Sequence, residues 1–160
     1  MLRWIALGLF AVQGVPPSAA QPPNTVQPPA PSQQAVAAAA PRVFASDYGL
    51  VLNFIKPDKT KDFEASVEKL KEALEKSPKP ERQQQAASWR VFKAVEAAAA
   101  GNVLYVFVID PPIKGADYTV STILAEAFPD EAQALYKQYA DSYGAGQNIV
   151  NLKLVSELGK

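Results

Sequence analysis

The chain has 160 residues, with 16 basic and 16 acidic side chains and neither cysteine nor histidine. The missing residue types exclude a disulfide, a thiolate nucleophile, a Cys/His zinc site and a Ser-His-Asp triad. The balanced charge argues against a general nucleic-acid binder, which normally carries a basic excess. No loop spaces carboxylates as a calcium site requires, so we expect neither a metal nor a cofactor. The length suits one domain with a core.

Residues 1–20 resemble a secretory signal peptide. Arg3 supplies the positive start, and residues 5–12 (IALGLFAV) form an apolar run that is too short to cross a bilayer core of about 30 Å. Ser18 is one of the small residues that precede a cut between Ala20 and Gln21. The alternative is an uncleaved N-terminal membrane anchor. We expect cleavage, a secreted or periplasmic protein of the bacterial envelope, and no stable membrane insertion afterwards.

Residues 21–42 are rich in proline, alanine and glutamine and contain almost no large side chain. Such a segment cannot bury enough apolar area to offset its ordering entropy, so we expect a disordered tether. The tether either holds the domain away from a membrane or wall, or is a spacer with no role beyond its length. The folded α+β domain is then expected over residues 43–160.

The first half of this domain predicts a strand followed by a helix. Residues 50–55 (LVLNFI) are an apolar run of strand length. Residues 61–76 predict an amphipathic helix, because large apolar side chains recur at spacings of four, three and four (Phe63, Val67, Leu70 and Leu74). We expect Asp58 or Thr60 to cap the start of this helix, and the prolines beyond it to end it.

The second half predicts a hairpin, a broken helical region and a last strand. Residues 89–95 and 103–109 predict two strands joined by a Gly-Asn turn signal. Residues 118–128 predict a helix that breaks at the next proline. A second helical piece carries three tyrosines and is expected to end at Gly144 as its C-cap. Residues 149–155 (IVNLKLV) alternate as a strand does.

The resulting order β-α-β-β-α-β resembles the ferredoxin-like sandwich. The resemblance covers residues 43–156 and implies an α+β fold, with a four-stranded antiparallel sheet in the order 4-1-3-2 and two helices on one face. In that order the first and third strands are central, and these two are the most uniformly apolar here. The other two carry charged and amide side chains, as edge strands often do (Arg90, Lys93, Asn151 and Lys153).

Both central strands are apolar on both of their faces, although two helices can cover only one. Exposing even three such side chains would forgo about 1.5–3 kcal/mol each, against a net domain stability of ~5–15 kcal/mol. We therefore expect a homodimer in which two copies pack through the open sheet face. The alternative is that the N-terminal segment or a long loop covers this face.

A sheet-to-sheet pair of this kind resembles the dimeric α+β barrel superfamily, which includes the antibiotic-biosynthesis monooxygenases. That resemblance implies a cleft between helices and sheet that can hold an apolar small molecule. Haem-degrading members use an Asn, a Trp and a His. This chain has Asn53 and Trp89 but no histidine, so none of those roles is carried over.

The stretch VLYVFVIDPPIKGADY, residues 103–118, permits two interpretations. In the functional one, Asp110 is a general base at the mouth of an apolar pocket, and Lys114 and Tyr118 polarise a substrate. In the structural one, Asp110 and the two prolines after it end the strand, because proline cannot donate to a ladder, and Asp117 caps the next helix.

Three further side chains are candidates for ligand binding. Asn53 is expected to face the buried side of a central strand, where its amide needs either protein partners or a ligand. Trp89 is either a core residue or a shelf for a cofactor. Tyr139 belongs to a set of tyrosines that either packs on the sheet or stacks on a carbohydrate.

These observations predict a small secreted domain that dimerises, binds an apolar small molecule and performs no catalysis. One alternative is a cofactor-independent oxygenase- or isomerase-like enzyme that uses Asp110, Tyr118 or Asn53. Another is an envelope assembly protein that recruits a partner through its tether and edge strands.

Overall fold

A computed structural model describes residues 40–159 of the chain. The expected signal peptide, its cut between Ala20 and Gln21, and residues 21–39 of the expected tether lie outside these residues. The strands are β1 (Tyr48–Ile55), β2 (Trp89–Ala97), β3 (Val103–Ile109) and β4 (Tyr143–Leu152). The helices are α1 (Thr60–Glu75), α2 (Pro80–Ser88), α3 (Val120–Ala127) and α4 (Ala132–Asp141), and short 3-10 turns occupy Pro57–Lys59 and Ala99–Gly101.

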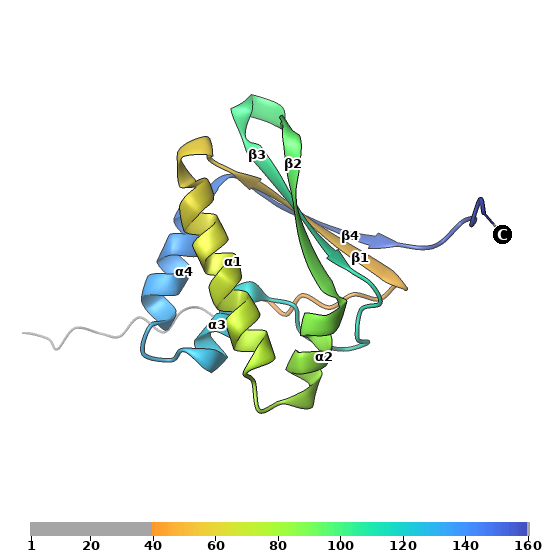
Figure 1. Cartoon of the computed structure of the whole chain (residues 1–160), viewed down its shortest axis with the longest axis horizontal. Helices are drawn as coiled ribbons and strands as arrows, with labels where there is room; N and C mark the ends of the chain where they lie inside the picture. The colour runs from red at the N-terminus through yellow and green to blue at the C-terminus, as the bar shows by residue number, and fades with distance from the viewer. Residues whose placement is uncertain (1–39, 160) are drawn as a thin grey trace, which may run out of the picture. The chain divides into compact units, whose positions relative to one another are not determined.

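The strands form one antiparallel sheet in the order β2-β3-β1-β4, and the helices pack on one side of it (Figure 1). This is the predicted order, and it confirms the α+β ferredoxin-like sandwich. β1 and β3 are central. In the register of these strands, Asn53 lies opposite Tyr105 of β3 on one side and Gln147 of β4 on the other.

The core lies between the sheet and the helices. Along β1, every second residue is buried, and Val51, Asn53 and Ile55 face the helices. Phe63 of α1 is fully buried at the centre, with its ring 4.7 Å from that of Tyr105. The predicted amphipathic character of α1 is therefore confirmed, since the helix presents one stripe of apolar side chains to the sheet.

The structure differs from the sequence predictions at several boundaries. The predicted caps of α1 do not act, because Lys59 is the N-cap residue and makes no side-chain cap hydrogen bond. α3 begins at Val120 rather than at residue 118, because the Tyr118 N–H donates to the Arg42 carbonyl (2.8 Å) and holds the chain extended. β4 starts at Tyr143, so Gly144 lies in a strand and not at a helix end.

Sequence analysis did not predict α2 because the helix has no apolar stripe. Its buried residues are Arg82, Gln85 and Ser88, which are polar but share one face. The Arg82 guanidinium donates to both carboxylate oxygens of Glu126 (3.1 and 3.3 Å) and to Gln85 Oε1 (2.8 Å). It also donates to the Asp117 carbonyl, so this helix is anchored by hydrogen bonds rather than by apolar packing.

The side of the sheet away from the helices carries the open face, a group of apolar residues from all four strands. Within residues 40–159, the helices leave this face uncovered (Figure 1). The side chains here are half-buried between their neighbours or exposed, and Phe92 is 53% exposed. The open face consists of Leu50, Leu52 and Phe54 of β1, Phe92 of β2, Leu104, Val106 and Val108 of β3, and Val150 and Leu152 of β4.

Candidate functional site

Two of the predicted ligand-binding residues, Asn53 and Tyr139, meet in one hydrogen-bonded group with Tyr143 and Gln147, here called the tyrosine network. Asn53 is fully buried, and its Nδ2 donates to the carbonyls of Val51 and Tyr105, each at 3.2 Å. These two bonds turn Oδ1 toward β4, where it accepts from the Tyr143 hydroxyl (3.0 Å) and Gln147 Nε2 (2.7 Å). Every hydrogen-bonding position of this amide is thus occupied by protein.

The two tyrosine hydroxyls of the network lie 2.6 Å apart, and Gln147 Nε2 is 2.7 Å from that of Tyr139. Burial raises the pKa of Tyr139 and of Tyr143 well above the ordinary value for a phenol. The positive charge of Arg42 opposes this effect on both pKa values but does not cancel it. Both hydroxyls therefore stay protonated and act as neutral donors at physiological pH.

Three members of the network, Tyr139, Tyr143 and Gln147, line a hollow of about 280 Å³, here called the tyrosine groove. α3 and α4 supply one side of the groove and β4 the other, and the chain entering at residue 42 forms its rim. The side chains that matter below are Arg42, Ser121, Tyr136, Tyr139, Tyr143 and Gln147. The groove thus combines a cation, hydroxyls and aromatic rings in one place.

Trp89 lies elsewhere, at the start of β2, where its ring contacts those of Phe107 and Tyr118 at 5.5 and 5.4 Å. Its indole Nε1 is buried and has no hydrogen-bond partner among the described residues. The residue also borders a hollow of about 270 Å³ between α1, α2 and β2, whose walls combine apolar residues such as Leu70 and Val91 with three charged ones (Glu68, Lys71 and Glu75). Trp89 is therefore both a core contact and the edge of a second hollow.

The candidate catalytic residues of the stretch 103–118 do not converge on a pocket. Asp110 forms an ion pair with Arg90 (3.3 Å), and both side chains are largely exposed. Tyr118 is buried, and its hydroxyl accepts from the Ile113 N–H (2.8 Å). Lys114 is exposed in the loop between them. These contacts are compatible with the structural interpretation of the motif. The predicted helix cap at Asp117 is wrong, because the N-cap residue of α3 is Thr119, and Asp117 Oδ1 instead accepts from the N–H groups of Arg42 and Thr119.

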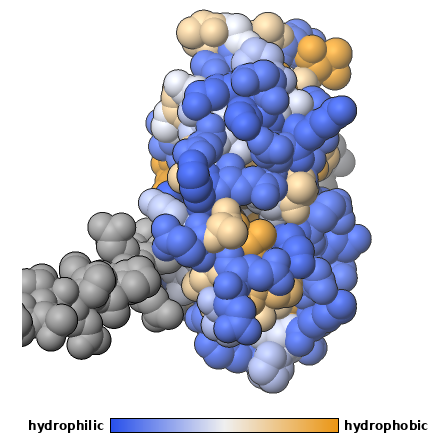
Figure 2. All heavy atoms as spheres, turned by 90° about the vertical axis from the view of Figure 1, so that its left-hand side faces the viewer, coloured by the Kyte–Doolittle hydropathy of each residue, from blue (hydrophilic) through white to orange (hydrophobic). Residues whose placement is uncertain are grey.

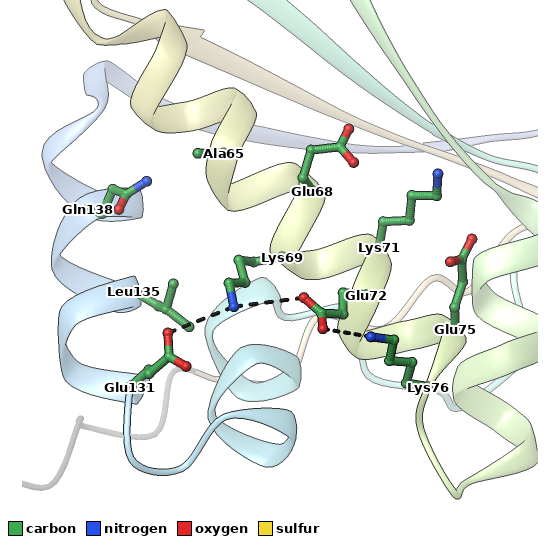
Figure 3. Close-up of a pocket in the computed structure, with 10 residues that line it drawn as sticks. All are labelled: Ala65, Glu68, Lys69, Lys71, Glu72, Glu75, Lys76, Glu131, Leu135 and Gln138. Carbon is green, nitrogen blue, oxygen red and sulfur yellow. Dashed lines mark hydrogen bonds and ion pairs between the residues drawn. The ribbon is translucent and has the colours of Figure 1, made fainter.

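Figure 3 shows a third hollow, of about 740 Å³, between α1 and α4. Lys69 lies between Glu72 (3.7 Å) and Glu131 (3.8 Å), and Lys76 pairs with Glu72 at 2.9 Å. Exposed pairs of this kind contribute only about 0–1 kcal/mol each. Four of the seven charged side chains that line this hollow already pair with one another, and we assign no ligand to it.

Three residues of the tyrosine groove were not predicted from the sequence: Arg42, Ser121 and Gln147. Gln147 lies just before the predicted last strand, and its role becomes visible only when β4 is seen to begin at Tyr143. Arg42 was assigned to the end of the tether, yet its N–H donates to Asp117 Oδ1 (2.9 Å) and Thr119 Oγ1 (3.0 Å). The one sequence feature that could have indicated a role for Arg42 was its position as the first charged residue after the proline-rich segment.

No protein-family model, no curated protein and no solved structure matches this chain. Within residues 40–159, no group of three or more acidic side chains is arranged to hold a metal ion. None of the helices in that range has the length and apolar character needed to span a bilayer. The function must therefore be inferred from the geometry of the domain itself.

Proposed function

We propose that this chain is a non-catalytic binding domain that forms a homodimer through the open face of its sheet. The observation that carries the proposal is the open face, where apolar side chains of all four strands lie together on the side without helices. Burying each such side chain is worth about 1.5–3 kcal/mol, so the face favours a partner. The helix side is different, since its surface is mainly hydrophilic (Figure 2).

A second copy fits this face better than the chain's own N-terminal segment does. Residues 21–39 contain only two valines larger than alanine and proline among their apolar side chains, so they cannot match so many large apolar groups. The described chain also enters on the helix side, where Arg42 and Thr119 line the tyrosine groove. Two open faces packed together would resemble a dimeric α+β barrel.

Native mass spectrometry of the purified protein tests this proposal, and Val106→Lys is the variant of choice. Val106 is half-buried at the middle of the open face, opposite Leu52 and Phe92. We expect twice the chain mass for the wild type and a single chain mass for Val106→Lys. Val95→Lys is the matched control, because Val95 is 96% exposed near the hairpin end, and this variant should remain dimeric. A wild-type protein of single chain mass would contradict the proposal.

We also propose that the hollow beside Trp89 takes an apolar small molecule. Its walls are mainly apolar, and Trp89 is the only tryptophan left after a cut at Ala20, since the other is Trp4. Ligand entry should therefore change the tryptophan emission saturably, and Val91→Lys should abolish this change. A broad panel of apolar compounds that leaves the emission unchanged would refute this part of the proposal.

Secretion is part of the same proposal and is tested separately. Intact-mass analysis of the protein recovered from the periplasm or medium should show a chain that begins at Gln21. A chain that begins at Met1 would indicate an anchor instead. The envelope-assembly alternative predicts a partner that co-purifies with the full chain and is lost when residues 21–39 are deleted. The enzyme alternative gains no support from the contacts of Asp110 and Tyr118 and is not proposed.

A further inference from the structure

Two polar side chains of the tyrosine groove, those of Arg42 and Ser121, are open to a ligand, although the Arg42 guanidinium also interacts with the Tyr139 hydroxyl. Arg42 forms no ion pair with any acidic side chain of residues 40–159, although nine such pairs occur elsewhere in that range. The Ser121 hydroxyl, which belongs to a residue that also lines the groove, likewise has no hydrogen-bond partner among the described residues. By contrast, the tyrosine network behind them is internally satisfied.

Arg42 is held in place by its backbone, which distinguishes it from a freely solvated surface arginine. Its N–H donates to Asp117 Oδ1 and Thr119 Oγ1, and its carbonyl accepts from the Tyr118 N–H. The side chain is half-buried, and its charge acts on the hydroxyls of Tyr139 and Tyr143 inside the groove. A half-buried guanidinium on a fixed backbone, with no carboxylate partner within residues 40–159, favours a planar anion, which it can bind with two parallel hydrogen bonds.

The rest of the groove suits a flat apolar body. Tyr136 is 41% exposed and lines the groove together with Val120 and Ala140. An exposed aromatic ring beside small apolar groups can stack on another planar group. The volume of about 280 Å³ lies just below the ~300–1,000 Å³ range of drug-sized ligand pockets, so the ligand must be small.

We propose that the tyrosine groove binds a small aromatic carboxylate. The carboxylate pairs with the Arg42 guanidinium and accepts from the Ser121 hydroxyl, while the ring of the ligand stacks on Tyr136. This site is independent of the dimer interface and of the Trp89 hollow, and it involves no covalent step.

Benzoate is the probe, and the readout is the shift of backbone amide NMR signals in the purified protein. Saturable shifts are expected at Gly146 and Gln147, with a dissociation constant on the order of 1 mM or below. Benzyl alcohol, which lacks the charge, and acetate, which lacks the ring, should each bind at least about tenfold more weakly. Inorganic phosphate at equal concentration should leave these signals unchanged.

The variants isolate the role of the guanidinium. Arg42→Gln should weaken benzoate binding at least about tenfold. Arg42→Lys should weaken it less, since lysine keeps the positive charge but cannot form two parallel hydrogen bonds with a carboxylate. The fold should survive, because the hydrogen bonds that hold Arg42 in place are those of its backbone, and the guanidinium adds only its interaction with the Tyr139 hydroxyl. Far-UV circular dichroism checks this. Arg90→Gln is the matched control and should bind as the wild type does, since Arg90 already pairs with Asp110.

Three results would overturn the proposal: no saturable shift with benzoate, equal binding by wild type and Arg42→Gln, or identical shifts with phosphate and benzoate. The first would mean that the groove is only a packing feature. The second would place the ligand away from Arg42, and the third would indicate a general anion site with no preference for a ring.

Discussion

Replacing Asn53 with alanine distinguishes a structural role of this amide from a ligand-binding one. The change removes the acceptor of the Tyr143 hydroxyl and of Gln147 Nε2, and also the donor to two backbone carbonyls. A buried polar group left unpaired costs about 1–3 kcal/mol. The Tyr143 hydroxyl can still donate to Tyr139 at 2.6 Å, so we expect a total loss of about 2–5 kcal/mol.

Urea denaturation followed by far-UV circular dichroism measures this loss as a change in the free energy of unfolding. It would be a large part of the ~5–15 kcal/mol that typically stabilises a domain. Asn148→Ala is the matched control, because Asn148 neighbours the network on β4 but is exposed, and its loss should stay within about 0.5 kcal/mol.

A double-mutant cycle with Tyr143→Phe should then show a coupling of about 0.5–3 kcal/mol, since the two side chains share a hydrogen bond. If Asn53→Ala is as stable as the wild type, the reasoning fails. The amide would then contribute nothing to the fold, and its placement would have to be explained by a ligand.

The remaining predictions concern other contacts of the core. Arg82→Ala should lower the free energy of unfolding by about 2–4 kcal/mol in the same urea assay, because Arg82 is only 4% exposed and its charged hydrogen bonds with Glu126 would be lost together with those to Gln85 and the Asp117 carbonyl. A loss under about 0.5 kcal/mol would refute this. Gly49→Ala should lower the free energy of unfolding by about 1–3 kcal/mol, measured by thermal or urea unfolding, because a Cβ there would clash with the buried ring of Phe44. Gly146→Ala is the control and should be neutral, since a Cβ there meets no atom within 4 Å. Burial raises the pKa of Tyr139 and Tyr143, so their contribution to stability is complete below the unfolded pKa of about 10 and is lost as pH rises above it. Their ultraviolet ionisation should therefore coincide with alkaline unfolding, and ionisation in a folded protein would contradict this.

The sheet could be predicted from the sequence because its signals are local. β3 is seven consecutive apolar residues before Asp110 and two prolines, and α1 repeats its apolar residues at helical spacing. With these elements in order, the doubly apolar central strands also predict that the second face of the sheet is apolar. The observed open face has this character.

The missed elements lack such local signals. α2 buries an arginine and a glutamine whose partners, Glu126 and the Asp117 carbonyl, are more than thirty residues away in sequence. In the sequence, Gly144 suggests the end of a helix. The structure requires a glycine here for a different reason, because a Cβ would clash with Oδ1 of Asn102, a residue far away in the sequence. Propensity reports on neighbours along the chain, so contacts of this kind cannot be predicted from it.

The candidate site also combines features that local sequence patterns predict with features that depend on long-range contacts. The burial of Asn53 follows from strand alternation, and the structure adds its partners. Tyr139 and Tyr143 are four residues apart, as on one helix, yet the first belongs to α4 and the second to β4. Their hydroxyls meet because the chain turns at Ser142, a fully buried residue whose hydroxyl donates to the Gln138 carbonyl at 2.7 Å.

The two proposed surfaces are linked through β1, because Tyr143 and Gln147 of the groove bond to Asn53 of that strand. Asn53 faces the tyrosine network, while its neighbours Leu52 and Phe54 belong to the open face. A ligand in the groove and a second copy on the open face would then both order the same strand, and any coupling between them must be reciprocal. Because Asn53 is already fixed by four hydrogen bonds within one chain, little ordering remains for dimerisation to supply. Val106→Lys should therefore bind benzoate as the wild type does while losing its partner, and a joint loss of both properties would show that the groove needs the dimer.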